Sequence, residues 1–86
     1  MKRAYAGHHH AMFRVGGYYF KGDKGLEQDK VEGIKWYHLA AEAGSSSAAH
    51  YLGGFYMKGD GVGQDVDKAL EYFQKAADLV ASNRLI

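Results

Sequence analysis

Residues 11–23 read AMFRVGGYYFKGD, and residues 48–60 read AAHYLGGFYMKGD. The two segments lie 37 positions apart, and seven of their thirteen residue pairs are identical. A fixed period of 20–50 residues is typical of repeat architectures, in which each repeat is one supersecondary unit. The sequence therefore predicts two tandem copies of one structural unit.

The similarity continues along the chain with a spacing of 36. Residues 25–29, GLEQD, match residues 61–65, GVGQD, and the pair Ala40-Ala41 matches Ala76-Ala77. The change of spacing falls between Asp23 and Gly25. Insertions in repeat arrays map to loops, so we expect a loop at this position.

Each unit is predicted to contain two helices. In the first helix, apolar side chains recur every four residues and share one face: Ala11, Val15 and Tyr19, then Ala48, Leu52 and Tyr56. Gly22 and Gly59 can adopt the left-handed conformation that ends a helix, and Lys21 and Lys58 suit its last turn.

The second helix of each unit is predicted to begin after Asp29 and Asp65, which are good N-caps, with Glu32 completing a capping box. Its apolar face consists of Ile34, Tyr37 and Ala41, then Leu70, Phe73 and Ala77. The chain has no proline and no alternating segment rich in β-branched residues, so the predicted fold class is all-α.

Composition excludes several functions. The net charge is +1 with the signs interleaved, so we expect no nucleic-acid binding. There is no cysteine, which excludes disulfides, thiolate metal sites and a cysteine nucleophile. The basic start, residues 1–3, is followed by no apolar core of a signal peptide, and no segment is long and apolar enough to cross a membrane. We expect a soluble chain, and its compartment stays undetermined.

The pattern A-x-x-x-L-G-x-x-Y-x-x-G, a G-x-G-V-x-Q-D loop, K-A and a later A-A resembles the Sel-1-like repeat, a relative of the tetratricopeptide repeat. Repeat two matches it at Ala48, Leu52, Gly53, Tyr56, Gly59, Gly61, Val62, Gln64, Asp65, Lys68, Ala69, Ala76 and Ala77. Repeat one matches it at Ala11, Gly16, Tyr19, Gly22, Gly25, Gln28, Asp29, Trp36, Ala40, Ala41 and Gly44.

Three positions depart from that pattern. Val15 replaces the usual leucine and Gly33 the usual alanine, and both are expected to loosen the packing of repeat one. Val80 stands where repeat one has Gly44, so we expect the last helix to run on and terminate the array.

The resemblance implies one α/α solenoid domain over residues 1–86. We assign residues 1–10 to the tail of a preceding repeat and a helix start, 11–47 to repeat one, 48–83 to repeat two and 84–86 to a C-terminal tail. Residues 3–7, RAYAG, resemble residues 40–44, AAEAG, which suggests that preceding repeat. About three repeats are usually needed to bury a continuous core. We therefore expect either a fragment of a longer array or a homo-oligomer formed through open solenoid ends.

By resemblance, the chain is a non-catalytic scaffold that binds a protein or peptide on the concave face of the first helices. The residues expected on this face are His10, Phe13, Gly17, Phe20, Lys21, Ser47, His50, Gly54, Met57 and Lys58. Stacked repeats would pair Phe13 with His50, Phe20 with Met57, and the two lysines, giving an apolar strip that suits a peptide with a carboxylate. The alternative is that the aromatic side chains belong to the core.

The residues offer little chemistry. Histidines 8, 9 and 10 are consecutive and point in different directions on a helix, so we predict no metal site and no cofactor. The glycine-rich loop 59–63 lacks a phosphate-binding Gly-Lys-Ser/Thr, and serines 45–47 are expected to cap the next helix. Two other functions stay open: a structural segment that self-associates, and part of a hydrolase-linked Sel-1-like protein.

Overall fold

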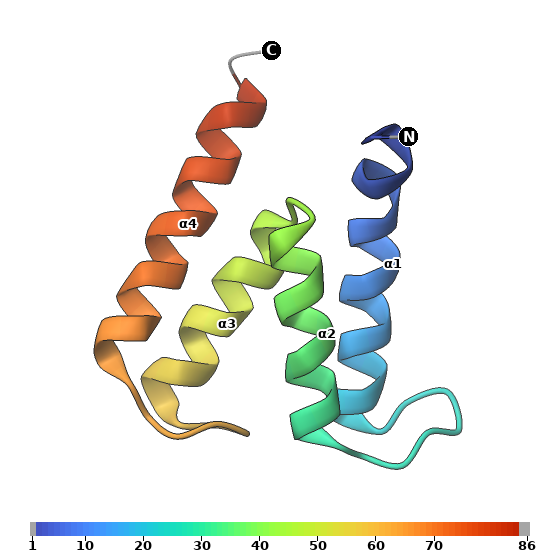
Figure 1. Cartoon of the computed structure of the whole chain (residues 1–86). Coiled ribbons are helices and arrows are strands. Elements are labelled where there is room, and N and C mark those ends of the chain that lie inside the picture. The colour runs from blue at the N-terminus through green and yellow to red at the C-terminus, as the bar shows by residue number, and fades with distance from the viewer. Residues whose placement is uncertain (1, 85–86) are drawn as a thin grey trace.

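The computed structural model describes residues 2–84, with side chains for residues 9–82. It contains four helices, α1 (Lys2–Lys21), α2 (Lys30–Glu42), α3 (Ser46–Lys58) and α4 (Val66–Arg84). Each helix packs on the next one in the chain, and α1 and α4 stand at the two ends of the row (Figure 1). The predicted all-α fold of two helix-turn-helix units is confirmed. None of the described helices is long and apolar enough to cross a membrane.

The helix ends lie where the turn residues predicted them. Gly22 and Gly59 have φ of 78° and 73°, and the helices before them end at Lys21 and Lys58. Glycine adopts this left-handed conformation without the steric cost of a Cβ.

Side-chain caps mark the starts of α2, α3 and α4. Asp29 Oδ1 accepts the N–H of Glu32, and Asp65 Oδ1 accepts that of Lys68, each at 3.0 Å. The Ser45 hydroxyl accepts the N–H of Ala48 at 3.1 Å and thereby caps α3, as expected. The caps satisfy backbone groups that the helices leave without partners.

The loop between α1 and α2 holds the extra residue that the change of spacing indicated. Lys24 has a φ of 58°, and no other non-glycine residue that the structure describes has a positive φ. The loop therefore accommodates the extra residue with one residue in the left-handed conformation, and α2 packs on α1 as α4 packs on α3.

The core lies where α2 and α3 meet and is built mainly of small side chains. Ala40, Ala48, Ala49 and Leu52 are fully buried, and Tyr37 is 3% exposed. Alanines bring the helix backbones close together, so that little side-chain volume is needed to fill the interface. The predicted apolar face of α4 is only partly covered: Phe73 is half-buried, whereas Leu70 and Ala77 are exposed.

Gly33 does not loosen repeat one, which corrects the expectation from the sequence. A Cβ built on Gly33 would lie 2.7 Å from the carbonyl oxygen of Gly16 and 2.8 Å from the backbone nitrogen of Phe20. The missing side chain therefore lets α1 and α2 approach more closely than an alanine would permit.

The chain ends extend the outer helices. α1 is one continuous helix from Lys2, and it runs through the segment assigned to the tail of a preceding repeat. That assignment and the repeat boundaries stay predictions. α4 continues past Val80 to Arg84, as the missing glycine predicted.

Candidate functional site: a groove beside α3

The aromatic residues predicted to form the α1 part of the binding face pack against α3. The Phe20 ring stacks on Phe55 with a centroid distance of 4.4 Å, and the Phe13 ring meets Tyr51 edge-on at 5.3 Å. Both phenylalanines are half-buried against the core, and both also contact the ring of Tyr37.

The predicted pairs of Phe13 with His50 and of Phe20 with Met57 therefore need correction. α3 turns Tyr51 and Phe55, which are one helical turn apart, toward α1. Phe13 and Phe20 thus pack mainly at the junction between the repeats, which agrees with the alternative interpretation.

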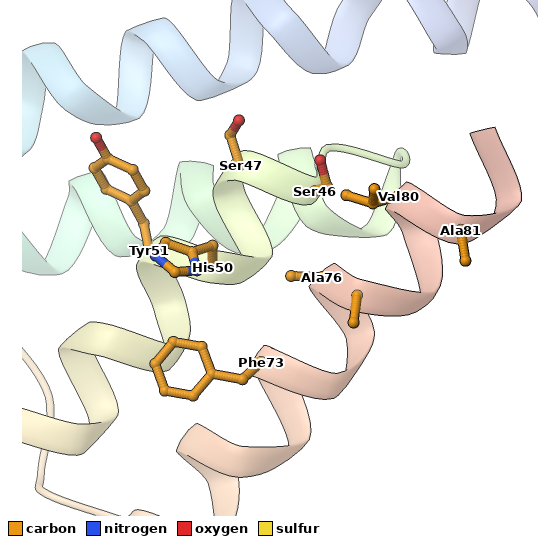
Figure 2. Close-up of a pocket in the computed structure, with 9 residues that line it drawn as sticks. Ser46, Ser47, His50, Tyr51, Phe73, Ala76, Val80 and Ala81 are labelled. Atoms are coloured by element: carbon orange, nitrogen blue, oxygen red, sulfur yellow. The ribbon is translucent and has the colours of Figure 1, made fainter. Parts of the chain in front are cut away.

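The open surface is a groove between α3 and α4, which we call the α3 groove. Its larger part has a volume of about 900 Å³ and a smaller part about 370 Å³, and the two share His50, Tyr51 and Phe73. Figure 2 shows Phe73 extending from α4 toward α3, where its ring lies 5.4 Å from that of His50. Besides these three, the lining consists of Ser46, Ser47, Gly54, Phe55, Lys58, Asp60, Ala76, Ala77, Val80 and Ala81.

Four of the predicted residues line the α3 groove: Ser47, His50, Gly54 and Lys58. Six do not: His10, Phe13, Gly17, Phe20, Lys21 and Met57. His10 and Lys21 are exposed on α1, and Gly17 faces Tyr37, whose hydroxyl would lie 3.3 Å from a Cβ at that position. The groove thus belongs to repeat two, whereas the prediction extended over both repeats.

The wall formed by α4 was not predicted. The helical spacing predicts Phe73 and Ala77 on an apolar inner face, and they match Tyr37 and Ala41 of repeat one, which α3 covers. No described helix covers α4 in the same way. The signal available in the sequence was this repeat alignment itself, because it shows which residues of α4 lack the cover their counterparts have.

The groove is apolar along its length and carries charge at one end. Val80 is 42% exposed and Tyr51 46% exposed, which is substantial for such large side chains. Lys58 is exposed near the end of α3. Lys30 Nζ forms an ion pair with Asp60 Oδ1 at 2.7 Å, and the same ammonium lies over the Phe20 ring. Asp60 therefore has its own cation, and the charge of Lys58 remains available to a ligand.

A polar cluster outside the groove lining joins α2 of repeat one to α3 and α4 of repeat two. The ring of His38 on α2 lies between two hydroxyls, with Tyr72 Oη 2.9 Å from Nδ1 and Tyr56 Oη 3.3 Å from Nε2. The two tyrosine rings stack almost in parallel. Burial lowers the pKa of His38 below its ordinary value. The carboxylate of Glu42 opposes this shift, and the ammonium of Lys68 adds to it. We call these three residues the His38 cluster.

The described residues form an open, mostly apolar surface between α3 and α4. Among the described residues, no three metal-ligating side chains come together. The pKa of His9 is lowered by burial and by its neighbour His10, and the pKa of Tyr37 is raised by burial and by Tyr51. These groups lie outside the α3 groove, so their shifts reflect packing.

Comparisons with known proteins agree with the repeat organisation. The family model described as the Sel1 repeat matches residues 9–45 and again residues 46–79. The crystal structure of a Sel1 repeat protein from Oxalobacter formigenes is similar, with a TM-score of 0.76 and 34% sequence identity. The match covers 81% of this chain and 28% of that one, so the chain spans less than a third of that protein. A comparison with curated proteins gave no match.

Proposed function

Since this chain belongs to the Sel1 repeat family, whose repeats generally act as protein-interaction scaffolds and are typically non-catalytic, we propose that it binds a protein or peptide segment in the α3 groove. The first helix of repeat two forms one wall of this groove and α4 forms the other. The observation that supports the proposal best is the apolar lining left open beside exposed aromatic side chains.

The groove favours an extended or helical segment that has apolar side chains and a carboxylate. Tyr51, His50 and Phe73 offer ring faces and edges for apolar anchors, which often dominate peptide recognition. Lys58 lies at one end of the smaller part, where an ammonium would attract an acidic side chain or a C-terminal carboxylate.

The test is capture of partners by the immobilised chain, with the double variant His50→Ala/Lys58→Ala in parallel. Both side chains are exposed, so we expect circular dichroism to show an unchanged helix content. Wild type should retain a specific protein that the variant loses at least about tenfold, which corresponds to roughly 1.4 kcal/mol.

A matched variant, His10→Ala/Lys21→Ala, removes one histidine and one lysine from α1 outside the groove, and it should capture like wild type. Equal capture by all three proteins would show that the α3 groove is not the binding surface. A loss with the α1 variant alone would move the site to repeat one.

A further inference from the structure

The repeat spacing relates the junction inside this chain to the two surfaces at its ends. Subtracting 36 or 37 from a junction residue of repeat two gives its counterpart on the outer side of repeat one, which we call the N-terminal face: Ala11, Arg14, Tyr18, Tyr19 and Trp36. Adding the same spacing to junction residues of repeat one gives the C-terminal face: Leu70, Phe73, Gln74, Ala76 and Ala77.

Each face has residues that are exposed although their counterparts at the junction are buried. Ile34 is 4% exposed and its counterpart Leu70 is 56% exposed. Ala41 is 2% exposed, while its counterpart Ala77 is exposed. At the other end, Ala48 is fully buried and its counterpart Ala11 is exposed. The C-terminal face therefore corresponds to the repeat-one side of the internal junction, and the N-terminal face corresponds to its repeat-two side.

We propose that a second copy of this chain docks its N-terminal face on the C-terminal face of the first, continuing the solenoid from copy to copy. The contact would repeat the geometry of the α2–α3 junction. Tyr51 and Phe55 contact Tyr37 at that junction, with ring centroids 5.8 and 5.4 Å apart. Arg14 and Tyr18 of the second copy would occupy those places against Phe73, so that a cation–π contact replaces one aromatic pair.

The polar side chains also correspond. The counterparts of His38, Tyr56 and Tyr72 are Gln74, Tyr19 and Trp36. A glutamine amide has a donor and an acceptor, and it can therefore bridge two polar groups as the imidazole does. Tyr19 and Trp36 of the second copy would then flank Gln74 of the first copy, as Tyr56 and Tyr72 flank His38 at the internal junction.

The copy-to-copy contact should be weaker than the internal junction and should not close. The counterparts of the Lys30–Asp60 ion pair are Val66 and Asp23, so that bridge is lost. The two faces differ from each other, and a head-to-tail contact that continues the superhelical path of the solenoid leaves a free face at each end of the assembly. Copies should therefore add one after another, giving a mass that rises with concentration.

Two variants separate the faces. Ala77→Arg places a bulky charged side chain on the C-terminal face, and Ala11→Arg does the same on the N-terminal face. Both alanines are exposed in the single chain, so each variant should fold like wild type by circular dichroism. Sedimentation velocity would be recorded from about 5 to about 500 µM, a range suited to weak association.

Wild type should form a series of species, and each variant alone should remain a monomer. An equimolar mixture of the two variants should form a one-to-one dimer. The intact N-terminal face of Ala77→Arg docks on the intact C-terminal face of Ala11→Arg, and the dimer cannot grow because both of its outer faces carry an arginine. A monomeric wild type at every concentration would overturn the proposal. So would a mixture that stays monomeric while wild type associates, since that result assigns association to another surface.

This inference goes beyond partner binding and can fail separately from it. Ala11→Arg leaves the α3 groove intact, so this monomer should capture a groove-bound partner at least as well as wild type does. Capture by Ala11→Arg without self-association of wild type would overturn the second-copy proposal alone. Self-association without capture by any form would overturn the scaffold proposal alone.

Discussion

Glycine has opposite effects at two places in the helices. Gly33 is buried, and its Cα lies against the backbone of α1 near Gly16 and Phe20. A Cβ at Gly54 would have nothing within 4 Å. The first glycine permits close helix packing, whereas the second only costs helix stability, because glycine is less favourable than alanine inside a helix.

Replacing these residues with alanine should therefore change stability in opposite directions. Gly33→Ala must push the two backbones apart, and overpacking of this kind lowers the free energy of unfolding by about 1–3 kcal/mol. Gly54→Ala should raise it by about 1 kcal/mol. Urea denaturation of both variants beside wild type measures this, and a Gly33→Ala protein as stable as wild type would contradict the close packing described here.

Each helix-turn-helix element is closed by the same Gln-Asp pair. Gln28 donates to the carbonyl oxygen of Phe20 at 3.0 Å, and Gln64 donates to that of Met57 at 2.9 Å. The backbone N–H groups of Asp29 and Asp65 donate to the backbone carbonyl oxygens of Tyr19 and Tyr56, respectively. The carboxylates of the same aspartates cap the next helix. The pair thus connects the end of one helix to the start of the next.

Gln64→Ala should lower the free energy of unfolding by about 1 kcal/mol, because the last turn of α3 loses a hydrogen bond to a carbonyl group. Gln74→Ala is the matched control, since among the described residues the Gln74 amide donates to Asp78 within the same helix. Thermal denaturation at low protein concentration should separate the two variants. Equal melting temperatures would indicate that the loop is held by its caps alone.

The elements could be predicted from the sequence because their ends depend on local chemistry. Gly22, Gly59, Asp29 and Asp65 act within a few residues of themselves, and each lies at the expected helix end. The binding surface could not be predicted in the same way. Phe13 has the same helical spacing whether its ring faces a ligand or Tyr51. That choice depends on the crossing of α1 and α3, which residues far apart in the sequence determine together.

At the scale of the whole molecule, the His38 cluster connects the two repeats. One nitrogen of the neutral imidazole donates and the other accepts, and each has a tyrosine hydroxyl as its partner. Burial raises the pKa of Tyr72 and lowers that of His38, so both side chains are neutral near pH 7.

Stability should therefore decrease on acidification. The unfolded chain takes up a proton at His38 near its ordinary pKa of 6.5, whereas the folded chain does so only at a lower pH. Stability present above pH 6.5 is lost as the pH falls toward the lowered pKa. Melting temperatures between pH 7.5 and 5.5 should fall less steeply in His38→Gln than in wild type. His9 contributes in the same direction, so some slope should remain.

Tyr72→Phe is the companion variant, because it removes one hydroxyl of the cluster and keeps the titrating ring. It should be less stable than wild type across the range by about 1 kcal/mol and should still lose stability on acidification. A His38→Gln protein with the full wild-type slope would place the pH dependence elsewhere.

The row of helices has a consequence for the speed of folding. Helices pack mainly on their neighbours in the chain, α1 on α2, α2 on α3 and α3 on α4, so the search for native contacts involves only short loops. Chains with such local contacts fold in microseconds to milliseconds. With no proline in the sequence, no slow cis–trans isomerisation delays any part of the population. Either hairpin can form first and provide a surface on which the other then assembles.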